Sequence, residues 1–252
     1  MLTTLMLSFV LAAAGEDLTQ VIARMEHAAI TGSVEQLEQC RDSLASALRD
    51  TSGRDAELTR YALAYADWRL YPLLSSDPAH GKQAAVYLAE AQTQLRQLIA
   101  ANPSHAEAHA LLATLYGQEI GSSAWRGMTL GPKSSASIDA ALKLARNNPR
   151  VALQAGVGAF FTPKMFGGGT DKAEREIRRA EKLFAEEPTN QPWPNWGRLD
   201  VLAWMGQVLA AKGDREGARS YYQRALALQP DYGWVRYVLL PALDQPAKKN
   251  KR

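Results

Sequence analysis

The sequence predicts an all-α protein, an α-α superhelical solenoid of about five helix pairs plus a C-terminal capping helix, and three observations support this prediction. Apolar residues recur at steps of three and four along most of the 252 residues, as they do on one face of an α-helix. Glycine, proline and short polar stretches separate these periodic segments and mark where helices end. No segment of useful length alternates apolar and polar residues as a half-buried β-strand does.

The first 14 residues differ from everything that follows. Residues 1–14 have no charged side chain, and an apolar run from Leu5 to Leu11 leads into three alanines. Such a run followed by small residues is typical of a secretory signal peptide, although no Lys or Arg precedes it here. We therefore predict a signal peptide at 1–14 and a periplasmic or secreted protein; the alternatives are a buried first helix and a cytoplasmic protein. The run is too short to span a bilayer and no later stretch is long and apolar enough, so we expect no transmembrane segment.

The net charge of +3 comes from the C-terminal end of the chain. Lys248, Lys249, Lys251 and Arg252 supply four positive charges, which leaves the chain before them at about −1. A near-neutral body lacks the basic surface that nucleic-acid binding needs. We therefore expect no nucleic-acid partner, a solenoid over residues 15–244, and a basic, disordered tail at 245–252.

The periodic stretches predict the helices in chain order. They are residues 17–30, 34–48, 58–70, 82–101, 106–118, 137–146, 151–161, a helix around Ala173, Ile177 and Ala180, the stretch 199–230, and 231–243. Pro72 and Pro78 predict a loop after the third helix, because proline lacks the backbone donor that a helix uses. The single cysteine, Cys40, lies at helical spacing from apolar neighbours, which predicts a small buried side chain, not a reactive thiol.

The stretch 199–230 is the most regular part of the chain. Two amphipathic segments meet at a short polar turn, residues 212–214. In the first segment, Gly206 leaves room for the close approach of a second helix. Small and aromatic residues share one face of the second segment: Ala218, Tyr222 and Ala225. This pattern suits a tight helix pair, since alanine lets two backbones approach and the aromatic ring fills the space between them.

This succession of Gly, Ala, aromatic, Ala and Pro resembles the tetratricopeptide repeat, a helix pair of about 34 residues, with the Pro at Pro230 and the first Trp shifted to Trp204. One such pair cannot bury its own apolar face, so the resemblance implies stacked neighbours. Weaker copies of the pattern precede it: Ala91, Leu95, Leu98 and Pro103, then Ala173, Ile177 and Ala180. The resemblance covers about residues 55–230 and implies a module that binds another protein.

A second resemblance depends on two short motifs. Residues 161–169 read Phe-Thr-Pro-Lys-Met-Phe-Gly-Gly-Gly before a repeat helix, and residues 194–197 read Pro-Asn-Trp-Gly. This arrangement is similar to that of bacterial envelope-associated repeat proteins of unassigned role. A Gly-Gly pair before an Ala-containing helix also resembles the accessory T-component of bacterial TRAP transporters. That second likeness implies a holder of a small ligand as the alternative function.

Irregular segments interrupt the repeats at three places. They are residues 121–135, 162–169 and 187–197. Insertions at equivalent points of successive repeats emerge on one rim of a solenoid, often the binding rim. We expect apolar side chains to gather there beside two lysines: Trp125, Met128 and Phe166, with Lys133 and Lys164. The alternative is that the apolar side chains only hold long loops in place.

Aromatic residues fall mostly at the spacing of a helical core. We expect most of them, including Tyr61, Tyr65 and Phe161, to be packed between helices. Trp193 and Trp196 lie in the proline-rich segment 187–197, and we expect them to clamp it against the last helix pair.

Motifs for catalysis or metal binding are weak in this sequence. Residues 167–169 lack the Gly-Lys-Ser/Thr ending and the preceding strand of a phosphate loop, so a flexible turn before a helix explains the three glycines better. His105 and His109 are four residues apart on one helical face, but no third ligand is evident. We therefore predict no cofactor, no metal and no catalytic residue.

The concave face, lined by the first helix of each pair, is where a solenoid of this kind binds its partners. Position within the repeat places uncharged or acidic residues on this face: Glu107, Thr114, Gln118, Gln154, Asp200 and Gln207. Together with Trp125 and Phe166 on the loops, they are the predicted partner-binding residues. Their character suits an extended peptide or a neutral segment of another protein. The sequence therefore predicts a non-catalytic adaptor or scaffold of the bacterial cell envelope.

Overall fold

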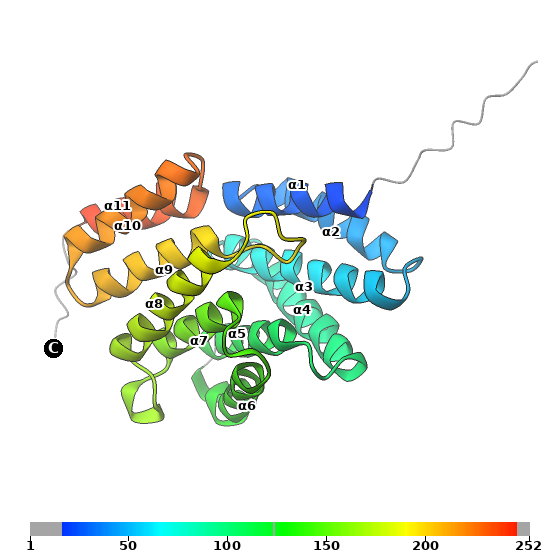
Figure 1. The fold of residues 1–252 in the computed structure, drawn as a ribbon, viewed down its shortest axis with the longest axis horizontal. Helices are drawn as coiled ribbons and strands as arrows, with labels where there is room; N and C mark the ends of the chain where they lie inside the picture. Colours follow the sequence, from blue (N-terminus) through cyan, green and yellow to red (C-terminus); the bar gives the residue numbers. More distant parts are fainter. Residues whose placement is uncertain (1–16, 123, 246–252) are drawn as a thin grey trace, which may run out of the picture.

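The computed structural model describes residues 17–122 and 124–245, and within them the protein is all-α, as predicted (Figure 1). Ten of the eleven α-helices in these residues pack as five successive pairs, and the eleventh belongs to a C-terminal cap. The predicted solenoid of about five helix pairs plus a capping helix is thereby confirmed. The predicted signal peptide at 1–14 and nearly all of the predicted tail at 245–252 lie outside the described residues.

The helices follow one another with short connections. The pairs are α1 (Leu18–Thr31) with α2 (Val34–Ala47), α3 (Gly53–Ser75) with α4 (Gly81–Ala101), α5 (Ala106–Ser122) with α6 (Gly127–Ala145), α7 (Pro149–Phe161) with α8 (Thr170–Glu186), and α9 (Arg198–Ala211) with α10 (Arg215–Leu228). Short 3-10 turns, η1 (Ala124–Arg126) and η2 (Lys164–Phe166), precede α6 and α8. The cap consists of a π-helical turn, η3 (Trp234–Leu239), and α11 (Leu240–Asp244). We call α1, α3, α5, α7 and α9 the first helices, because each opens a pair.

The small and bulky residues of the repeat pattern form the contacts between helices. All of them are buried: Ala91, Leu95, Leu98, Ala173, Ile177, Ala180, Ala218, Tyr222 and Ala225. At Gly206 a Cβ atom would overlap the ring of Tyr222, so the glycine is required for the close approach of α9 and α10. Gly213 ends α9 with a φ of +89°, as the turn prediction implied.

Two predicted loops are mostly helical. Helix α3 continues through Pro72 to Ser75, and α6 begins at Gly127 and contains Pro132, inside the predicted loop 121–135. Beyond the first turn of a helix, proline removes one hydrogen bond and clashes with the preceding turn, at a cost of about 3 kcal/mol. Packing outweighs that cost: Leu74 is buried beyond Pro72. In α6, the Ser134 hydroxyl donates to the backbone of α5, at 2.9 Å.

The two ends of the array are tied together. The guanidinium of Arg69 on α3 donates to Asp200 on α9 at 2.9 Å and to the carbonyl of Ala29 on α1 at 3.1 Å. The Tyr232 hydroxyl, just before η3, donates to the same Asp200 oxygen at 3.0 Å. At Gly233 a Cβ atom would overlap the carbonyl oxygen of Thr31, so the cap also lies against the end of α1. The first pair, the last pair and the cap therefore share one set of contacts.

No helix in the described residues has the length and apolar character needed to cross a membrane.

Candidate functional site

The connection between α8 and α9 crosses the first helices instead of looping away from them. We call residues 187–197 the strap; they contain neither helix nor strand. Figure 1 shows the strap as the irregular yellow segment near the middle of the molecule, below α1 and beside α9. Its side chains and backbone contact α1, α3 and α7, and its C-terminal end leads into α9. The strap therefore joins first helices that are far apart in the chain.

Both strap tryptophans pack against aromatic residues of α3. The Trp193 ring lies 5.3 Å from the ring of Tyr61, between centroids, and 6.0 Å from that of Tyr65. The Trp196 ring is 5.4 Å from Tyr65 and 5.5 Å from Trp68, and its side chain is only 5% exposed. The prediction that these tryptophans clamp the strap against the last helix pair is wrong. The strap reaches back to an aromatic face of α3 formed by Tyr61, Tyr65 and Trp68.

Glu26 on α1 also binds the strap. Its carboxylate accepts a hydrogen bond from Trp193 Nε1 at 3.0 Å. The Asn195 amide, oriented with its nitrogen toward Glu26, donates to both carboxylate oxygens at 2.8 and 3.1 Å. Burial raises the pKa of Glu26 to about 7, although the hydrogen bond from Trp193 and the positive charge of Arg150 act in the other direction.

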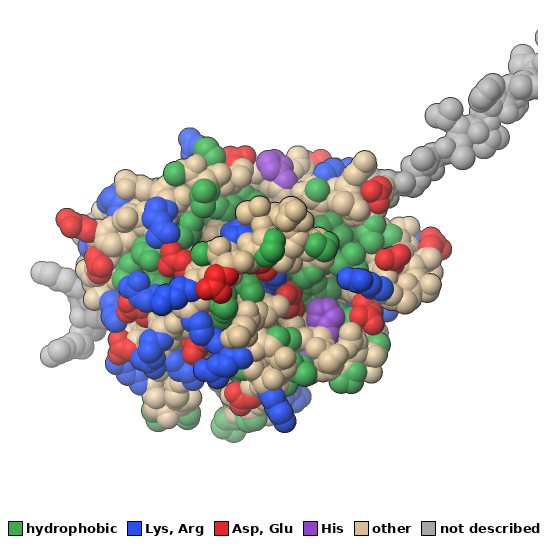
Figure 2. All heavy atoms as spheres, in the orientation of Figure 1, with side chains coloured by type: hydrophobic (Ala, Val, Ile, Leu, Met, Phe, Trp, Pro, Cys, Tyr) green, Lys and Arg blue, Asp and Glu red, His purple; other side chains and the backbone are tan. Residues whose placement is uncertain are grey.

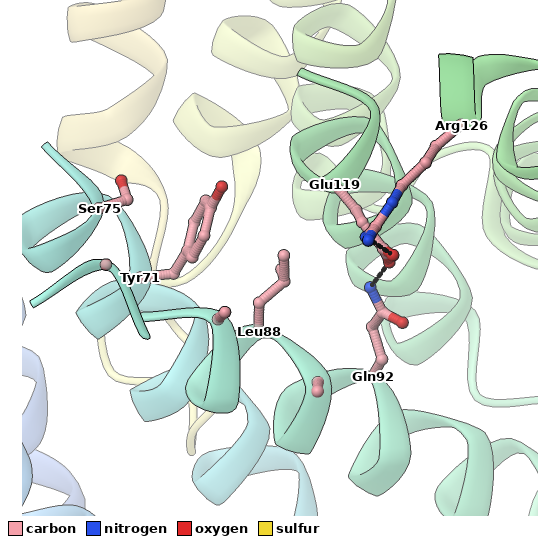
Figure 3. A pocket seen from close by; sticks show the side chains of 9 residues that line it. Tyr71, Ser75, Leu88, Gln92, Glu119 and Arg126 are labelled. Carbon is pink, nitrogen blue, oxygen red and sulfur yellow. Dashed lines mark hydrogen bonds and ion pairs between the residues drawn. The ribbon is translucent and has the colours of Figure 1, made fainter. Parts of the chain in front are cut away.

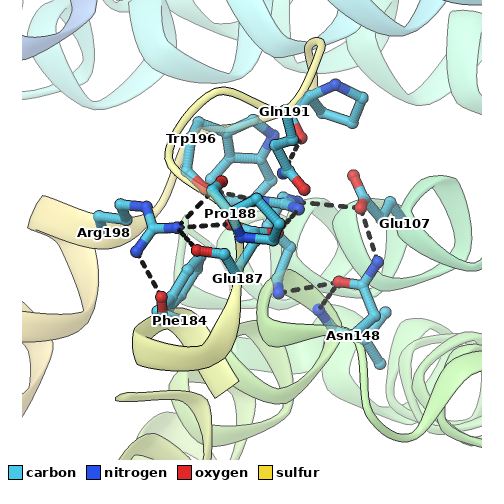
Figure 4. A network of polar contacts seen from close by, with 11 residues as sticks. Glu107, Asn148, Phe184, Glu187, Pro188, Gln191, Trp196 and Arg198 are labelled. Carbon is cyan, nitrogen blue, oxygen red and sulfur yellow. Dashed lines mark hydrogen bonds and ion pairs between the residues drawn. The ribbon is translucent and has the colours of Figure 1, made fainter. Parts of the chain in front are cut away.

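Arg150 is the polar centre of the site. Figure 4 shows Glu107, Asn148, Glu187 and Trp196 gathered in this network. Its Nε donates to Glu107 at 2.9 Å, and its Nη1 donates to the carbonyl of Trp196 in the strap at 3.1 Å. The guanidinium also pairs with Glu187, the first residue of the strap. The side chains of Arg150, Glu107 and Glu187 are 4%, 10% and 8% exposed, so two carboxylates and one guanidinium share a site almost closed to water. Asn148 completes it by donating to Glu107 at 2.7 Å while its oxygen caps the start of α7.

The electrostatics of the site follow from this burial. Burial alone would lower the pKa of Arg150, but Glu107 and Glu187 outweigh it and raise that pKa above its ordinary value. Burial, together with the charge of Glu107, raises the pKa of the Tyr61 hydroxyl well above its ordinary value. Arg150 therefore stays charged and Tyr61 stays neutral at any physiological pH, and neither is placed to exchange protons. The arrangement holds a segment of chain in position.

Three predicted partner-binding residues do not face outward. Glu107, Gln154 and Asp200 are 8%, 3% and 6% exposed, so the prediction that they lie on an open concave face is wrong. Glu107 forms an ion pair with Arg150, and Asp200 forms one with Arg69. Gln154 accepts a hydrogen bond from Thr114, another predicted residue, at 2.6 Å and so joins α7 to α5. The protein's own contacts fill this part of the first-helix face.

The remaining predicted residues are accessible. Gln118 and Gln207 are half-buried on α5 and α9. Trp125, Met128 and Phe166 are 74%, 84% and 72% exposed, so they neither pack their loops down nor bury one another. Phe161, expected in the core, is also 67% exposed. A role of these accessible side chains in partner binding stays a prediction.

Sequence reasoning missed the charged residues that hold the strap, Glu26, Arg150 and Glu187. Arg150 had a detectable signal, because it directly follows Pro149 at the start of an otherwise apolar helix. A charged residue in such a position is buried in folded proteins only when it is paired. Glu26 and Glu187 carried no comparable signal, since each has another charged or polar residue close by in the sequence.

The weak motifs of the sequence have structural roles. Gly167 and Gly169 have φ angles of +81° and +102°, which other residues rarely adopt, so the glycines shape the turn before α8. The His105 ring packs 5.2 Å from the ring of Tyr61 and accepts from the backbone of Ala108 at 3.2 Å. Among the described residues, no three His, Cys, Asp or Glu side chains are grouped to hold a metal ion.

A pocket of about 340 Å³ lies between α3, α4 and the end of α5 (Figure 3). It is lined by Tyr71, Ser75, Gly81, Ala85, Leu88, Ala89, Gln92, Glu119 and Arg126. At its polar end Glu119 accepts from Gln92 at 2.7 Å and from Arg126 at 2.6 Å. A small-ligand holder with its site on the loops would have an apolar cavity beside Trp125 and Phe166, but neither residue lines this pocket.

Comparison with known proteins places this architecture among helical repeats. No model of a protein family matches the sequence, and no curated protein resembles it. TTC0263, a TPR protein of Thermus thermophilus, superposes with a TM-score of 0.63 at 15% identity, over 91% of this chain and 99% of the other. The HusA haemophore from Porphyromonas gingivalis superposes with a TM-score of 0.54 at 20% identity, over 79% of this chain and 96% of the other. The chain therefore has a tetratricopeptide-like helical repeat fold.

Proposed function

We propose that this protein is a non-catalytic protein-interaction module of the bacterial cell envelope, and that its first helices bind an extended, uncharged segment of a partner. The main support for this proposal is the way in which the strap is bound. A surface that holds a segment of irregular chain through two tryptophans, one backbone carbonyl and one asparagine has the contacts that extended-peptide recognition needs. The half-buried Gln118 and Gln207 add donors and acceptors on the first helices beyond the strap.

The surface around the strap is compatible with a neutral partner segment. In the space-filling view, hydrophobic side chains lie beside the strap with individual charged side chains at its edge, whereas Lys and Arg side chains gather where α8 lies (Figure 2). A neutral segment would avoid the cost of burying further charge beside Arg150.

Site-specific crosslinking in cells tests the proposal. A photoreactive amino acid replaces Gln118 or Gln207, and a third variant carries it at Lys182, an exposed position on the outer helix α8, as the matched control. We expect one discrete protein adduct from the two first-helix positions and none from Lys182. Capture should also weaken in the double variant Gln118→Ala with Gln207→Ala. Adducts of equal yield from all three positions would contradict the proposal.

The envelope location is tested separately. It depends on the apolar residues 1–14 and their alanine-rich end. N-terminal sequencing of the protein isolated from the periplasm should find a chain that begins at Gly15. A full-length chain confined to the cytoplasm would contradict this part of the proposal and leave the interaction module intact.

The second candidate function is a small-ligand holder, and the pocket between α3, α4 and α5 favours it. Its volume lies at the lower end of the range for small-molecule sites, and one of the similar structures is described as a haemophore. Hemin titration followed by absorbance is the direct test. Saturable binding that is lost in Ala85→Trp, which would fill the pocket from an exposed position, would favour this candidate over the first. Binding that is unchanged in Ala85→Trp, or no binding, would remove it.

A further inference from the structure

The first helices bind the strap through side-chain and backbone contacts of the kind that bind a separate peptide. Trp193 and Trp196 pack on α3, Trp193 also donates to α1, and Arg150 holds the carbonyl of Trp196. The strap turns at residues 189–190 and bends at Trp193, so its side chains reach different neighbours. The strap's long-range partners lie on other helices, so its position depends on the surface beneath it.

The chemistry of the strap is distinct from that of the helices. Residues 188–197 read Pro-Thr-Asn-Gln-Pro-Trp-Pro-Asn-Trp-Gly and contain no charged side chain. Pro192 and Pro194 flank Trp193 and restrict the backbone, which lowers the entropy that is lost when the segment binds. Tryptophan is the residue type that most often dominates binding energy at protein interfaces. The segment thus has the features of a short, pre-organised ligand.

We propose that the strap is an internal ligand of the first helices. The partner contributes an uncharged segment of the same kind, with two tryptophans three residues apart beside proline, and this segment binds by displacing the strap. This inference depends on the proposed function and adds to it the chemistry of the partner and the reason why the face is filled in the free protein. A partner segment of this type would reproduce the contacts with Glu26, with the aromatic residues of α3 and with Arg150.

A peptide titration tests this inference directly. The probe is a fluorescent, end-capped peptide of residues 188–197, and the protein is the full chain with Trp193→Ser and Trp196→Ser, which removes both anchors while the connection stays intact. Fluorescence anisotropy should show saturable binding to this variant and at least about tenfold weaker binding to the unaltered protein, whose site is occupied. A peptide with both tryptophans replaced by alanine should not bind either protein.

A second substitution locates the binding site. Glu26→Ala in the anchor-free variant removes the acceptor of the tryptophan and asparagine hydrogen bonds and should weaken peptide binding about tenfold, equivalent to about 1.4 kcal/mol. Glu35→Ala, on the exposed side of α2, is the matched control and should leave binding unchanged. Equal effects of the two substitutions would overturn the proposed site.

The outcomes separate this inference from the proposed function. Absence of binding to a folded anchor-free variant overturns the inference, even if crosslinking at Gln118 and Gln207 still captures a partner. If circular dichroism shows that the double variant is unfolded, the single variant Trp193→Ala, at a half-buried position, replaces it. If neither variant folds, the strap is an inseparable part of the core and the inference is wrong.

Discussion

The strap and the turn at 162–169 have similar amino-acid compositions, but their large apolar side chains are packed in the strap and exposed in the turn. Each joins two helices, each contains proline and glycine, and each carries two large apolar side chains. In the strap, Trp196 is 5% exposed and Trp193 is half-buried, whereas Met165 and Phe166 in the turn are 82% and 72% exposed. Composition alone does not distinguish a segment that is bound from one that is not.

The difference in exposure comes from the surface that each segment contacts. The turn leaves the C-terminal end of α7, and its polar contacts are local, such as Lys172 Nζ donating to the carbonyl of Gly167 at 2.9 Å. The strap leads into the N-terminal end of α9, where the N-terminal residues of α5 and α7 supply Glu107 and Arg150. Its partners come from helices that precede it by as much as 167 residues, as with Glu26 and Trp193. Long-range partners, and not the segment's own residues, decide whether it is held.

The largest effect should come from the buried anchor. Trp196→Ala should lower the free energy of unfolding by about 3–5 kcal/mol, because it leaves a cavity against Tyr65 and Trp68. Phe166→Ala, the counterpart in the turn, should change it by no more than about 0.5 kcal/mol. Urea unfolding followed by circular dichroism measures both. Similar decreases in the free energy of unfolding of the two variants would contradict the difference between the strap and the turn.

Removing the charge beneath the strap should have the next largest effect. Arg150→Ala leaves Glu107 buried without its cationic partner and Glu187 with only the longer pair to Arg198, at 3.5 Å, and should cost about 3 kcal/mol at neutral pH. The control is Arg178→Ala, which breaks an exposed pair with Glu174 and should cost less than about 1 kcal/mol. If the two losses measured by urea unfolding are the same, the Arg150 pairs are not buried in solution.

Glycines at the ends of the two segments allow a matched test of backbone geometry. Gly197 has a φ of +108°, and a Cβ atom there would lie 2.5 Å from Cζ of Phe184, so Gly197→Ala should cost about 2–3 kcal/mol from strain and overlap together. Gly167 has a φ of +81° with open space around it, so Gly167→Ala should cost only the strain, about 1 kcal/mol. Thermal unfolding should rank the variants in this order. If Gly167→Ala lowers the melting temperature more than Gly197→Ala, the strap does not pack against Phe184.

The effect with a pH signature concerns Glu26. The pKa of Glu26 in the folded protein, about 7, lies above its ordinary value of 4.5, so the folded state favours the protonated form. That contribution to stability is present below about pH 4.5 and is lost as the pH rises through 7. The charged neighbours that face Glu26 are Arg150 and Arg69, which lower its pKa, and Asp200, which raises it.

Glu26→Gln removes the titration and keeps an oxygen that can accept from Trp193. The melting temperature of the variant, relative to the unaltered protein, should therefore increase between pH 5 and pH 8. The matched control, Glu35→Gln, should show no such trend. A difference that is independent of pH would mean that Glu26 is solvated and that the strap does not cover it.

Much of the fold could be predicted because it depends on local spacing. The buried positions of α4, α8 and α10 repeat every three or four residues, and Gly206 opposite Tyr222 follows from the same pattern. The prediction failed where proline was treated as a strict boundary, at Pro72 and Pro132, because tertiary packing continues both helices past the residue. Of the predicted partner-binding residues, Glu107, Gln154 and Asp200 were placed on the first helices correctly, but their burial was not predicted.

Sequence alone determined the succession of paired helices, because each pair is specified by contacts between residues close together in the chain. Only the tertiary structure decided that the strap lies on α1 and α3 and that Arg69 joins Ala29 to Asp200. These contacts span tens to more than a hundred residues, and they depend on how far the stacked pairs curve. The curvature is the sum of small rotations between neighbouring pairs, and no single repeat contains it.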